Sequence, residues 1–300
     1  MKKFILFLKE VRAPFFTASI IPVLLGTVVA YRQFKNFNPL YFVLVLLGSV
    51  FFHAGANVAN DYFDHKSGND EANKEFVGPF TGGSRLIQNG LLTPREVQLE
   101  FIAFFAAGLL VFSFLAVKSG FPLILMGLIA VFSGYFYIAP PVFLVSRGIG
   151  ELLVGLNFGP LLCCSAYYVQ AGILTPVPFF ASLPLALLVT AILYINEFPD
   201  YSADKLVGKN NLVVRLGRKK AVYGYAFLMV LVFAVTVAGV IYGAFPVYSL
   251  LLLVIIPLAF MSVNNLCNNY DNPEGLKISC VMTVMMHLAG GLLFTLGYLL

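Results

Sequence analysis

The chain contains no tryptophan and unusually little charge. Of its 300 residues, 11% are charged and 60% are hydrophobic, and the mean hydropathy is +0.89. Because a soluble domain is nearer half apolar and a quarter charged, this composition excludes an ordinary soluble protein. It indicates an all-α, polytopic membrane protein.

Cysteine is also scarce, and the chain has no long polar linker. The four cysteines include no Cys-x-x-Cys pair, so neither a zinc site nor a disulfide framework is predicted. Without a linker, residues 1–300 are expected to form a single transmembrane domain. The net charge of +5 fits loops beside anionic lipid and gives no indication of nucleic acid as a partner.

Hydropathy predicts nine membrane-spanning helices in a bundle, each close to the ~20 residues needed to cross the hydrocarbon. The rule that Lys and Arg collect in the cytoplasm places the N-terminus and two active-site loops, about 61–97 and 199–220, on the inner side of the cell membrane. The outer side then receives only Arg32, Lys35 and Lys118. The helices are expected near 14–31, 40–60, 98–117, 120–138, 150–170, 178–198, 221–243, 246–264 and 278–299.

Two short acidic clusters stand at the ends of apolar runs. Residues 60–68 read Asn-Asp-Tyr-Phe-Asp-His-Lys-Ser-Gly, and residues 200–209 read Asp-Tyr-Ser-Ala-Asp-Lys-Leu-Val-Gly-Lys. Ionisable groups in such places are costly unless they are paired, which makes them functional candidates. The clusters end the second and sixth predicted helices, which suggests two related four-helix halves followed by a ninth helix.

Helical phase groups the oxygen-bearing side chains of each cluster, because a helix turns ~100° per residue. On the sixth helix this holds only if Pro199, which predicts a kink or break, leaves the register intact. Oxygen ligands suit Mg²⁺, which prefers a few carboxylates together with substrate phosphates. The alternative is that the acids merely cap helix ends, but the repeated pattern disfavours it. The two stripes are Asn57, Asn60, Asp61 and Asp64 on the second helix, and Asn196, Glu197, Asp200 and Asp204 on the sixth.

Basic side chains near the clusters are expected to meet diphosphate oxygens, since charge-assisted hydrogen bonds are strong. These are Lys66, Arg85, Lys205 and Lys209.

Asn60-Asp61-x-x-Asp64 and Asp200-x-x-x-Asp204 resemble the two metal-binding motifs of the UbiA superfamily of intramembrane prenyltransferases. Within it, residues 60–70, 82–94, 139–151 and 208–217 are similar to the 1,4-dihydroxy-2-naphthoate prenyltransferases of menaquinone biosynthesis. Two departures stand out. Gly68 occupies the place of a third aspartate, with Asp70 two residues on, and Glu197 follows Asn196 where a second amide is commoner.

The resemblance implies Mg²⁺-dependent transfer of an isoprenyl group from a polyprenyl diphosphate to an aromatic quinone precursor, 1,4-dihydroxy-2-naphthoate in the first instance. Glu197 is then a metal ligand or an acceptor-side base. Arg147 holds the acceptor's carboxylate or the diphosphate, or is simply a cytoplasmic arginine. The implied metal ligands are Asn60, Asp61, Asp64, Asp200 and Asp204; the catalytic acids are Asp61, Asp64, Asp200, Asp204 and Glu197; and the substrate-binding residues are Asn57, Asn60, Lys66, Arg85, Tyr137, Arg147, Asn196, Lys205 and Lys209.

Two alternatives stay open at the level of sequence. The acceptor could be 4-hydroxybenzoate, homogentisate, a glyceryl phosphate ether lipid or haem. A cation-coupled transporter would also carry carboxylates on broken helices. Against the transporter, the acids lie at cytoplasmic helix ends rather than near the midplane, and the lysines beside them would hinder the passage of cations.

Overall fold

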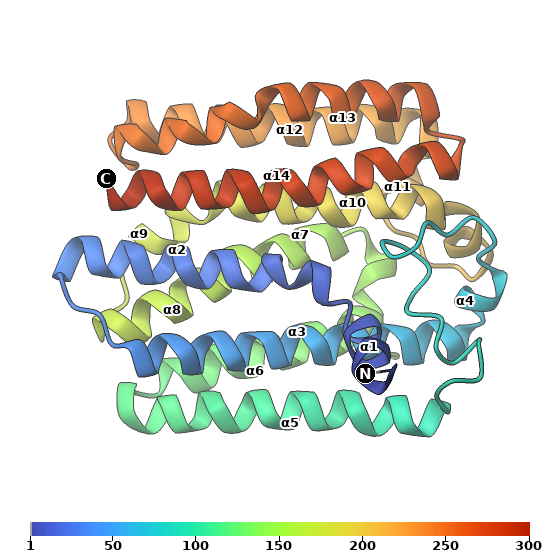
Figure 1. Cartoon of the computed structure of the whole chain (residues 1–300), viewed down its shortest axis with the longest axis horizontal. Helices are drawn as coiled ribbons and strands as arrows, with labels where there is room; N and C mark the ends of the chain where they lie inside the picture. The colour runs from blue at the N-terminus through green and yellow to red at the C-terminus, as the bar shows by residue number, and fades with distance from the viewer. Residues whose placement is uncertain (1) are drawn as a thin grey trace.

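The computed structural model describes the backbone of residues 2–300 and the side chains of residues 6–300. Long helices lie side by side with nearly parallel axes (Figure 1). Eight helical segments are long and apolar enough to cross a membrane. A ninth, α6 (Pro122–Ile138), has 17 residues, which is at the lower limit for a span. The expected all-α membrane bundle of about nine helices is thus confirmed over the described residues.

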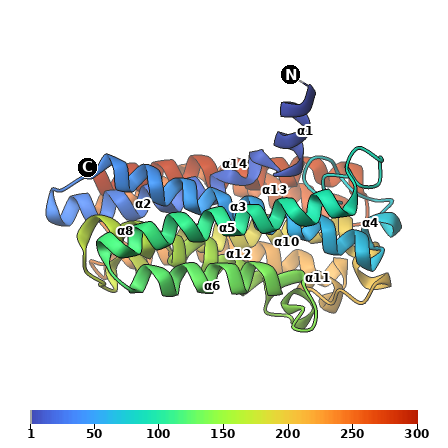
Figure 2. The same ribbon diagram turned by 90° about the horizontal axis from the view of Figure 1, so that it is seen from below.

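The helices follow the predicted order, with short elements between them. A short helix, α1 (Lys2–Glu10), precedes the bundle and projects from its side (Figure 2). The remaining elements are η1 (Ala13–Phe16), α2 (Thr17–Phe34), α3 (Pro39–Ser67), α4 (Asn69–Ala72), α5 (Pro94–Ser119), α6, η2 (Leu144–Arg147), α7 (Gly150–Leu156), η3 (Asn157–Leu161), α8 (Leu162–Ala171), α9 (Val177–Ala181), α10 (Leu183–Leu206), α11 (Leu212–Leu216), α12 (Arg218–Ile241), η4 (Val247–Ile255), α13 (Ile256–Asn269) and α14 (Pro273–Leu299).

Helix α3 carries the first acidic cluster on its last turns. Its start is marked by Asn38, whose side chain accepts a hydrogen bond from the Tyr41 N–H at 3.1 Å, and by Pro39, whose missing N–H is not needed there. It ends at Gly68, where φ is 76°, in the left-handed region that glycine adopts without strain. Since the helix has 29 residues, it extends past the predicted boundary near residue 60. The acids are therefore helical.

Helix α10 carries the second cluster and runs without interruption through Pro199. Of the predicted kink or break at this proline, the break is wrong. Proline removes one backbone donor, but membrane helices tolerate that loss where neighbouring groups satisfy the backbone. The acceptor that Pro199 leaves without a helical donor is the Ile195 carbonyl, four residues before it; at the next turn, Arg218 Nε donates to the Phe198 carbonyl at 3.1 Å. The uninterrupted helix keeps Asn196, Glu197 and Asp200 in the register that the sequence analysis required.

The fifth span is irregular in a way that the sequence analysis did not predict. Between α7 and α8, η3 has the wider π-helical turn and contains Pro160. Such bulges occur frequently at functional sites. Here the bulge presents Asn157 and Phe158 to a central cavity.

Two buried apolar clusters hold the bundle together. One joins α3, α5 and α6, and the other joins α10, α12, η4, α13 and α14, while α2 and α8 contribute to both. Glycine allows the closest contacts: a Cβ at Gly26 would lie 2.2 Å from the Cys163 carbonyl oxygen, and one at Gly108 would lie 2.4 Å from the Phe52 ring. The loops after α3 and α10 reach the same end of this framework (Figure 1).

Candidate active site

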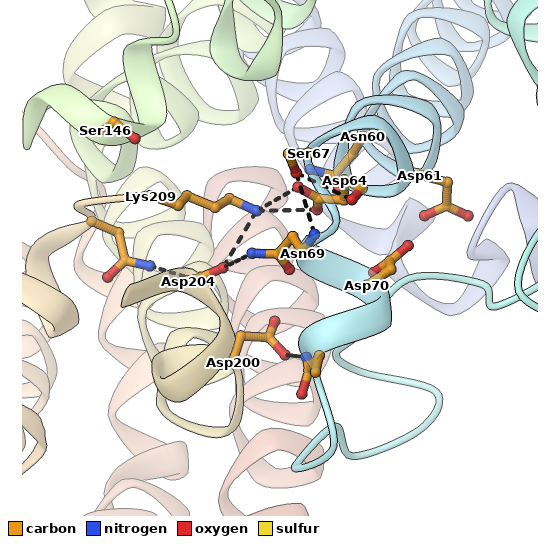
Figure 3. A network of polar contacts seen from close by, with 12 residues as sticks. Asn60, Asp61, Asp64, Ser67, Asn69, Asp70, Ser146, Asp200, Asp204 and Lys209 are labelled. Carbon is orange, nitrogen blue, oxygen red and sulfur yellow. Dashed lines mark hydrogen bonds and ion pairs between the residues drawn. The ribbon is translucent and has the colours of Figure 1, made fainter. Parts of the chain in front are cut away.

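The two acidic clusters meet at that end of the bundle (Figure 3). Lys209, in the loop after α10, points its Nζ to both carboxylate oxygens of Asp64 on α3, at 3.1 Å each. The same Nζ lies 3.7 Å from Asp204 on α10. Burial opposes the charge of this amine, but Asp64, Asp204 and Asp200 together raise the pKa of Lys209. The ammonium group therefore stays charged and joins the two halves of the site.

Amide side chains hold the acids of the second cluster in place. Asn69 and Asn211 donate to the two oxygens of Asp204 at 2.7 and 2.8 Å. Asn73 donates to Asp200 at 2.6 Å. Asn69 and Asn73 follow α3, so the loop after the first cluster fixes the carboxylates of the second. Hydrogen bonds to an ionised carboxylate are stronger than neutral ones.

Asp61 faces away from this cluster (Figure 3). One of its oxygens pairs with the Arg12 guanidinium, and the other accepts the Ser84 backbone N–H at 3.0 Å. Arg12 also donates to Asn60 at 3.1 Å. Asp61 thus joins the segment before α2 to the loop after α3.

That loop approaches the acids closely because it is built from glycine. At Gly83, φ is 72°, and a Cβ there would lie 3.0 Å from Asp61 Oδ1 and 3.1 Å from Asp70 Oδ2. Gln88 donates to the same Asp70 oxygen at 3.2 Å, and Arg85 donates to the Asp70 carbonyl. Burial, together with Asp64 and Asp61, raises the pKa of Asp70 to about 8.

Two adjoining cavities differ in character. The acidic cavity, about 90 Å³, is lined by residues of both clusters and their loops. The apolar cavity, about 170 Å³, lies between α2, α3, α6, α7–η3 and α10, and a further space of about 50 Å³ adjoins it around Phe52 and Leu161. The residues that line both main cavities are Asn60, Tyr137, Leu193 and Asn196. A polar head and an apolar tail of one molecule would fit this pair of spaces.

Most of the predicted site residues come together here. Asn57 lines the apolar cavity and donates to the Val11 carbonyl at 2.9 Å. The predicted residues that line the acidic cavity are Asn60, Asp64, Tyr137, Asn196, Glu197, Asp200, Asp204 and Lys209.

Most of the predicted cationic residues lie outside the acidic cavity. Lys66 and Lys205 are exposed and lie over the rings of Tyr62 and Tyr201, at 5.1 and 5.7 Å. Arg85 lies over the Phe76 ring at 4.5 Å. Arg147 is exposed, and its Nε donates to the Val142 carbonyl at 2.8 Å. Of the cations that were expected to meet diphosphate, only Lys209 lines the acidic cavity.

Several residues of the site were missed by the sequence analysis. An isolated amide or acid carries no signal of its own, although Asn69, Glu151 and Asn211 lie in segments that the resemblance covers. The missed residues are Arg12, Asn69, Asn73, Glu151 and Asn211.

The donor set fits a hard divalent cation such as Mg²⁺. Among residues 6–300, no three His, Cys, Asp or Glu side chains are grouped closely enough to form a ready-made metal site. However, Asp70 Oδ1 and Asn196 Oδ1 are buried oxygens that lack a hydrogen-bond partner among the described residues. They line the same cavity as Asp64 and Asp200. Carboxylate and amide oxygens in a cavity with room for a phosphate are what Mg²⁺ prefers.

Comparison with known proteins places this geometry in a family. The model of the UbiA prenyltransferase family matches residues 19–296. The 2-carboxy-1,4-naphthoquinone phytyltransferase of Synechocystis is 28% identical over 298 residues, which cover 98% of this chain and 92% of that protein. The 1,4-dihydroxy-2-naphthoate octaprenyltransferase of Bacillus subtilis is 28% identical over 284 residues, 95% of this chain and 89% of that one. A solved structure of a UbiA homologue from Archaeoglobus fulgidus bound to DMAPP and Mg²⁺ has a TM-score of 0.63 at 20% identity, over 96% of this chain and 98% of that one, which shows a shared fold.

Proposed function

The chain belongs to the UbiA prenyltransferase family and is a multi-pass membrane prenyltransferase, and on that premise we propose that it transfers a polyprenyl group from its diphosphate to 1,4-dihydroxy-2-naphthoate, as in menaquinone biosynthesis. The observation that carries the proposal is the meeting of two acidic clusters around Lys209, beside an apolar cavity. The names of the two naphthoate-prenylating relatives support this acceptor. We further propose a single domain in the cell membrane, with the site on the cytoplasmic side.

The donor is proposed to bind across both cavities. Its diphosphate occupies the acidic cavity, and its isoprenyl chain occupies the apolar one. Asn60, Asp64, Asp200 and Asp204 would hold Mg²⁺, which when bound supplies Lewis-acid assistance to the departing diphosphate. Asp61 is left out of this set because it is not among the residues that line the acidic cavity and its carboxylate instead binds Arg12 and the Ser84 N–H.

Lys209 has two proposed roles. With no donor bound, it neutralises Asp64 and Asp204, which would otherwise repel each other across the cavity. With the donor bound, its ammonium meets the diphosphate oxygens and stabilises the charge that develops on them. Positive groups aimed at a leaving group act strongly in a site that excludes water.

The acceptor is proposed to bind where the cavities join. Tyr137 and Asn196 line both spaces there, and Phe158 adds a further ring to the apolar wall. Ring faces stabilise an allylic cation by about 2 kcal/mol or more when water is excluded. Attack at the ring carbon that carries the carboxylate is followed by loss of CO₂.

The test uses membranes that contain the protein, Mg²⁺, a labelled isoprenyl diphosphate and one acceptor at a time. A prenylated, decarboxylated 1,4-naphthalenediol is the expected product. If only 4-hydroxybenzoate or only homogentisate is prenylated, that compound is the acceptor and the proposed one is wrong. Release of diphosphate with no prenylated aromatic product would overturn the proposed reaction.

A further inference from the structure

Lys209 is a buried residue between two exposed ones. It is 9% exposed, whereas Gly208 and Asn210 on either side of it lie on the surface. Packing therefore does not fix the neighbours of the lysine. Its own peptide groups bond within the same segment, since its N–H donates to the Asp204 carbonyl at 2.8 Å and its carbonyl accepts from the Asn211 N–H at 3.1 Å. These bonds tie the lysine to the end of α10, and its position relative to the other helices needs a further contact.

The Ser146 hydroxyl supplies that contact on both sides of the lysine. Ser146 lies in η2, beside the loop that carries Lys209 (Figure 3). Its Oγ donates to the Gly208 carbonyl at 3.2 Å. The same oxygen accepts the Asn210 N–H at 3.2 Å. One hydroxyl thus joins the two residues that flank Lys209 and connects both of them to η2.

The Arg215 side chain, on α11, joins the same two segments. Its Nη2 donates to the Ser146 carbonyl at 2.9 Å, and its Nε donates to the Asn210 carbonyl at 2.8 Å. Gly148 leaves room for the guanidinium, because a Cβ at this position would lie 3.0 Å from Arg215 Nε. A planar guanidinium has donors in fixed directions, and the ammonium of a lysine does not reproduce that arrangement.

The segment that contains Ser146 is itself held at the wall of the site. Val145, the residue before the serine, is 2% exposed and lines the acidic cavity. A few residues further on, Glu151 Oε1 accepts the Leu212 N–H at 2.6 Å. Residues 139–151 and 208–217, which the sequence analysis singled out, therefore bond to each other at several points. The first segment can serve as a fixed support for the second.

We propose that Ser146 and Arg215 are positioning residues that hold Lys209 in the acidic cavity, and that they act on the diphosphate only through this lysine. The inference rests on the proposed function, in which Lys209 meets the diphosphate oxygens. A lysine carries its charge on a flexible stem, so the place of its backbone decides whether the ammonium reaches the leaving group. A displacement of about 1 Å is enough to lower a rate ~100-fold.

The first experiment measures where the lysine lies and does not depend on turnover. An amine-reactive acylating reagent is applied to the folded protein, and mass spectrometry of its peptides compares the labelling of Lys209 with that of the exposed Lys205. In wild type, Lys209 should label more slowly, because it is buried and paired with acids. Ser146→Ala and Arg215→Lys should each raise the labelling of Lys209 and leave that of Lys205 unchanged. Ser146→Thr, which retains the hydroxyl, should behave as wild type.

The second experiment tests whether the serine acts through Lys209. Alone, Ser146→Ala should lower kcat for prenyl transfer roughly 10–100-fold. In the Lys209→Met background, the same change should lower the residual rate less than about twofold, since the group that the serine positions is gone. Ser202→Ala is the matched control, because Ser202 is exposed and donates to Glu75 at 3.0 Å. The control should change neither the rate nor the labelling of Lys209.

Two results would overturn the inference. One is a pair of losses that multiply in the double variant, which would show that Ser146 supports the fold and does not act through Lys209. The other is unchanged labelling of Lys209 in Ser146→Ala. If Ser146→Ala does not fold, Arg215→Lys replaces it in both experiments, and the same two results decide. A wild-type protein that prenylates no aromatic compound would instead refute the proposed function, and the labelling experiment would still test the placement of Lys209.

Discussion

Lys209 donates to both carboxylate oxygens of Asp64, at 3.1 Å each, and so links the loop after α10 to the end of α3. Without the lysine, Asp64 and Asp204 would be two buried acids with no shared counter-charge. Removal of one partner from a buried ion pair is strongly destabilising. The same contact explains how halves that are far apart in sequence act as one site.

Lys209→Met should reduce prenyl transfer by at least ~100-fold, because it removes both the link between the acids and the charge that meets diphosphate. Lys205→Met is the matched control. Lys205 lies in the last turn of α10, but it is exposed and lies over Tyr201, so its loss should change transfer less than about twofold. Initial rates at saturating donor measure both. Equal losses in the two variants would contradict the assignment of Lys209.

Asp64→Ala and Asp200→Ala should abolish turnover while leaving a folded protein. Wild type should be thermally stabilised by Mg²⁺ with a non-reacting diphosphate analogue, since a ligand that binds only the native state raises its stability. Both variants should lose this stabilisation, and a chelator should remove it from wild type. Asp271→Ala is the control, because Asp271 is exposed and 3.9 Å from Arg218. Near-normal turnover in both acid variants would refute the metal assignment.

Arg12 and Asp61 should behave as a coupled pair. Each single change, Arg12→Met or Asp61→Asn, leaves a buried group without its partner and should lower stability and transfer together. The double variant should lose less than the sum of the two, with a coupling free energy of about 0.5–3 kcal/mol. If Asp61 were instead a metal ligand, Asp61→Asn would abolish Mg²⁺-dependent stabilisation and Arg12→Met would not.

Glu10→Gln should remove a pH dependence of stability. Burial, together with Glu100, raises the pKa of Glu10 from 4.5 to about 9. Between these values the native state keeps a proton that the unfolded chain releases, so wild-type stability falls as pH rises through this range. The variant should show a flatter profile.

A thiol-reactive dye can follow this unfolding as labelling of the buried free Cys163 and Cys280, in addition to the labelling of the exposed Cys267 in the folded protein. Glu274→Gln, at an exposed position, should keep the wild-type profile. Identical profiles for wild type and Glu10→Gln would contradict the prediction.

Gly134→Leu should shorten the donor that the enzyme accepts. Gly134 lines both the apolar cavity and the space that adjoins it. An added Cβ would lie 3.7 Å from Ala56, which is an ordinary contact, so Gly134→Ala should be tolerated and serves as the control. A leucine projects further into the space. We expect kcat/KM for long-chain donors to fall by roughly 10–200-fold relative to dimethylallyl diphosphate. If this ratio of kcat/KM values is unchanged, the isoprenyl chain does not bind in the apolar cavity.

The sequence predicted the bundle and half of the site's chemistry for identifiable reasons. Apolar runs of spanning length can be read directly, and the repeated acidic cluster marked the two helices that carry carboxylates. Of the predicted kink or break at Pro199, the break was wrong, because a membrane helix packed among neighbouring helices tolerates the loss of one backbone donor. The π-helical turn at η3 had no local signal beyond Pro160.

The sequence could not show which of the lysines lines the acidic cavity. Lys66, Lys205 and Lys209 each lie close in sequence to the aspartates of their cluster. Of the three, only Lys209 lines the acidic cavity. Its direction depends on how the loop after α10 turns, and Asn211 and Asn69 hold that region by bonding Asp204. Such a path results from contacts between segments that are distant in the chain.

By itself, the sequence determined that this is an integral membrane protein with two oxygen-rich helix faces. Hydropathy and helical phase are local properties of a chain, so both can be read without the fold. Only the tertiary structure decided that Lys209 lies between Asp64 and Asp204 and that Asp61 binds Arg12. Each pairing joins charged groups from segments that are distant in the sequence. These groups become buried, and therefore need a partner, only when the helices pack.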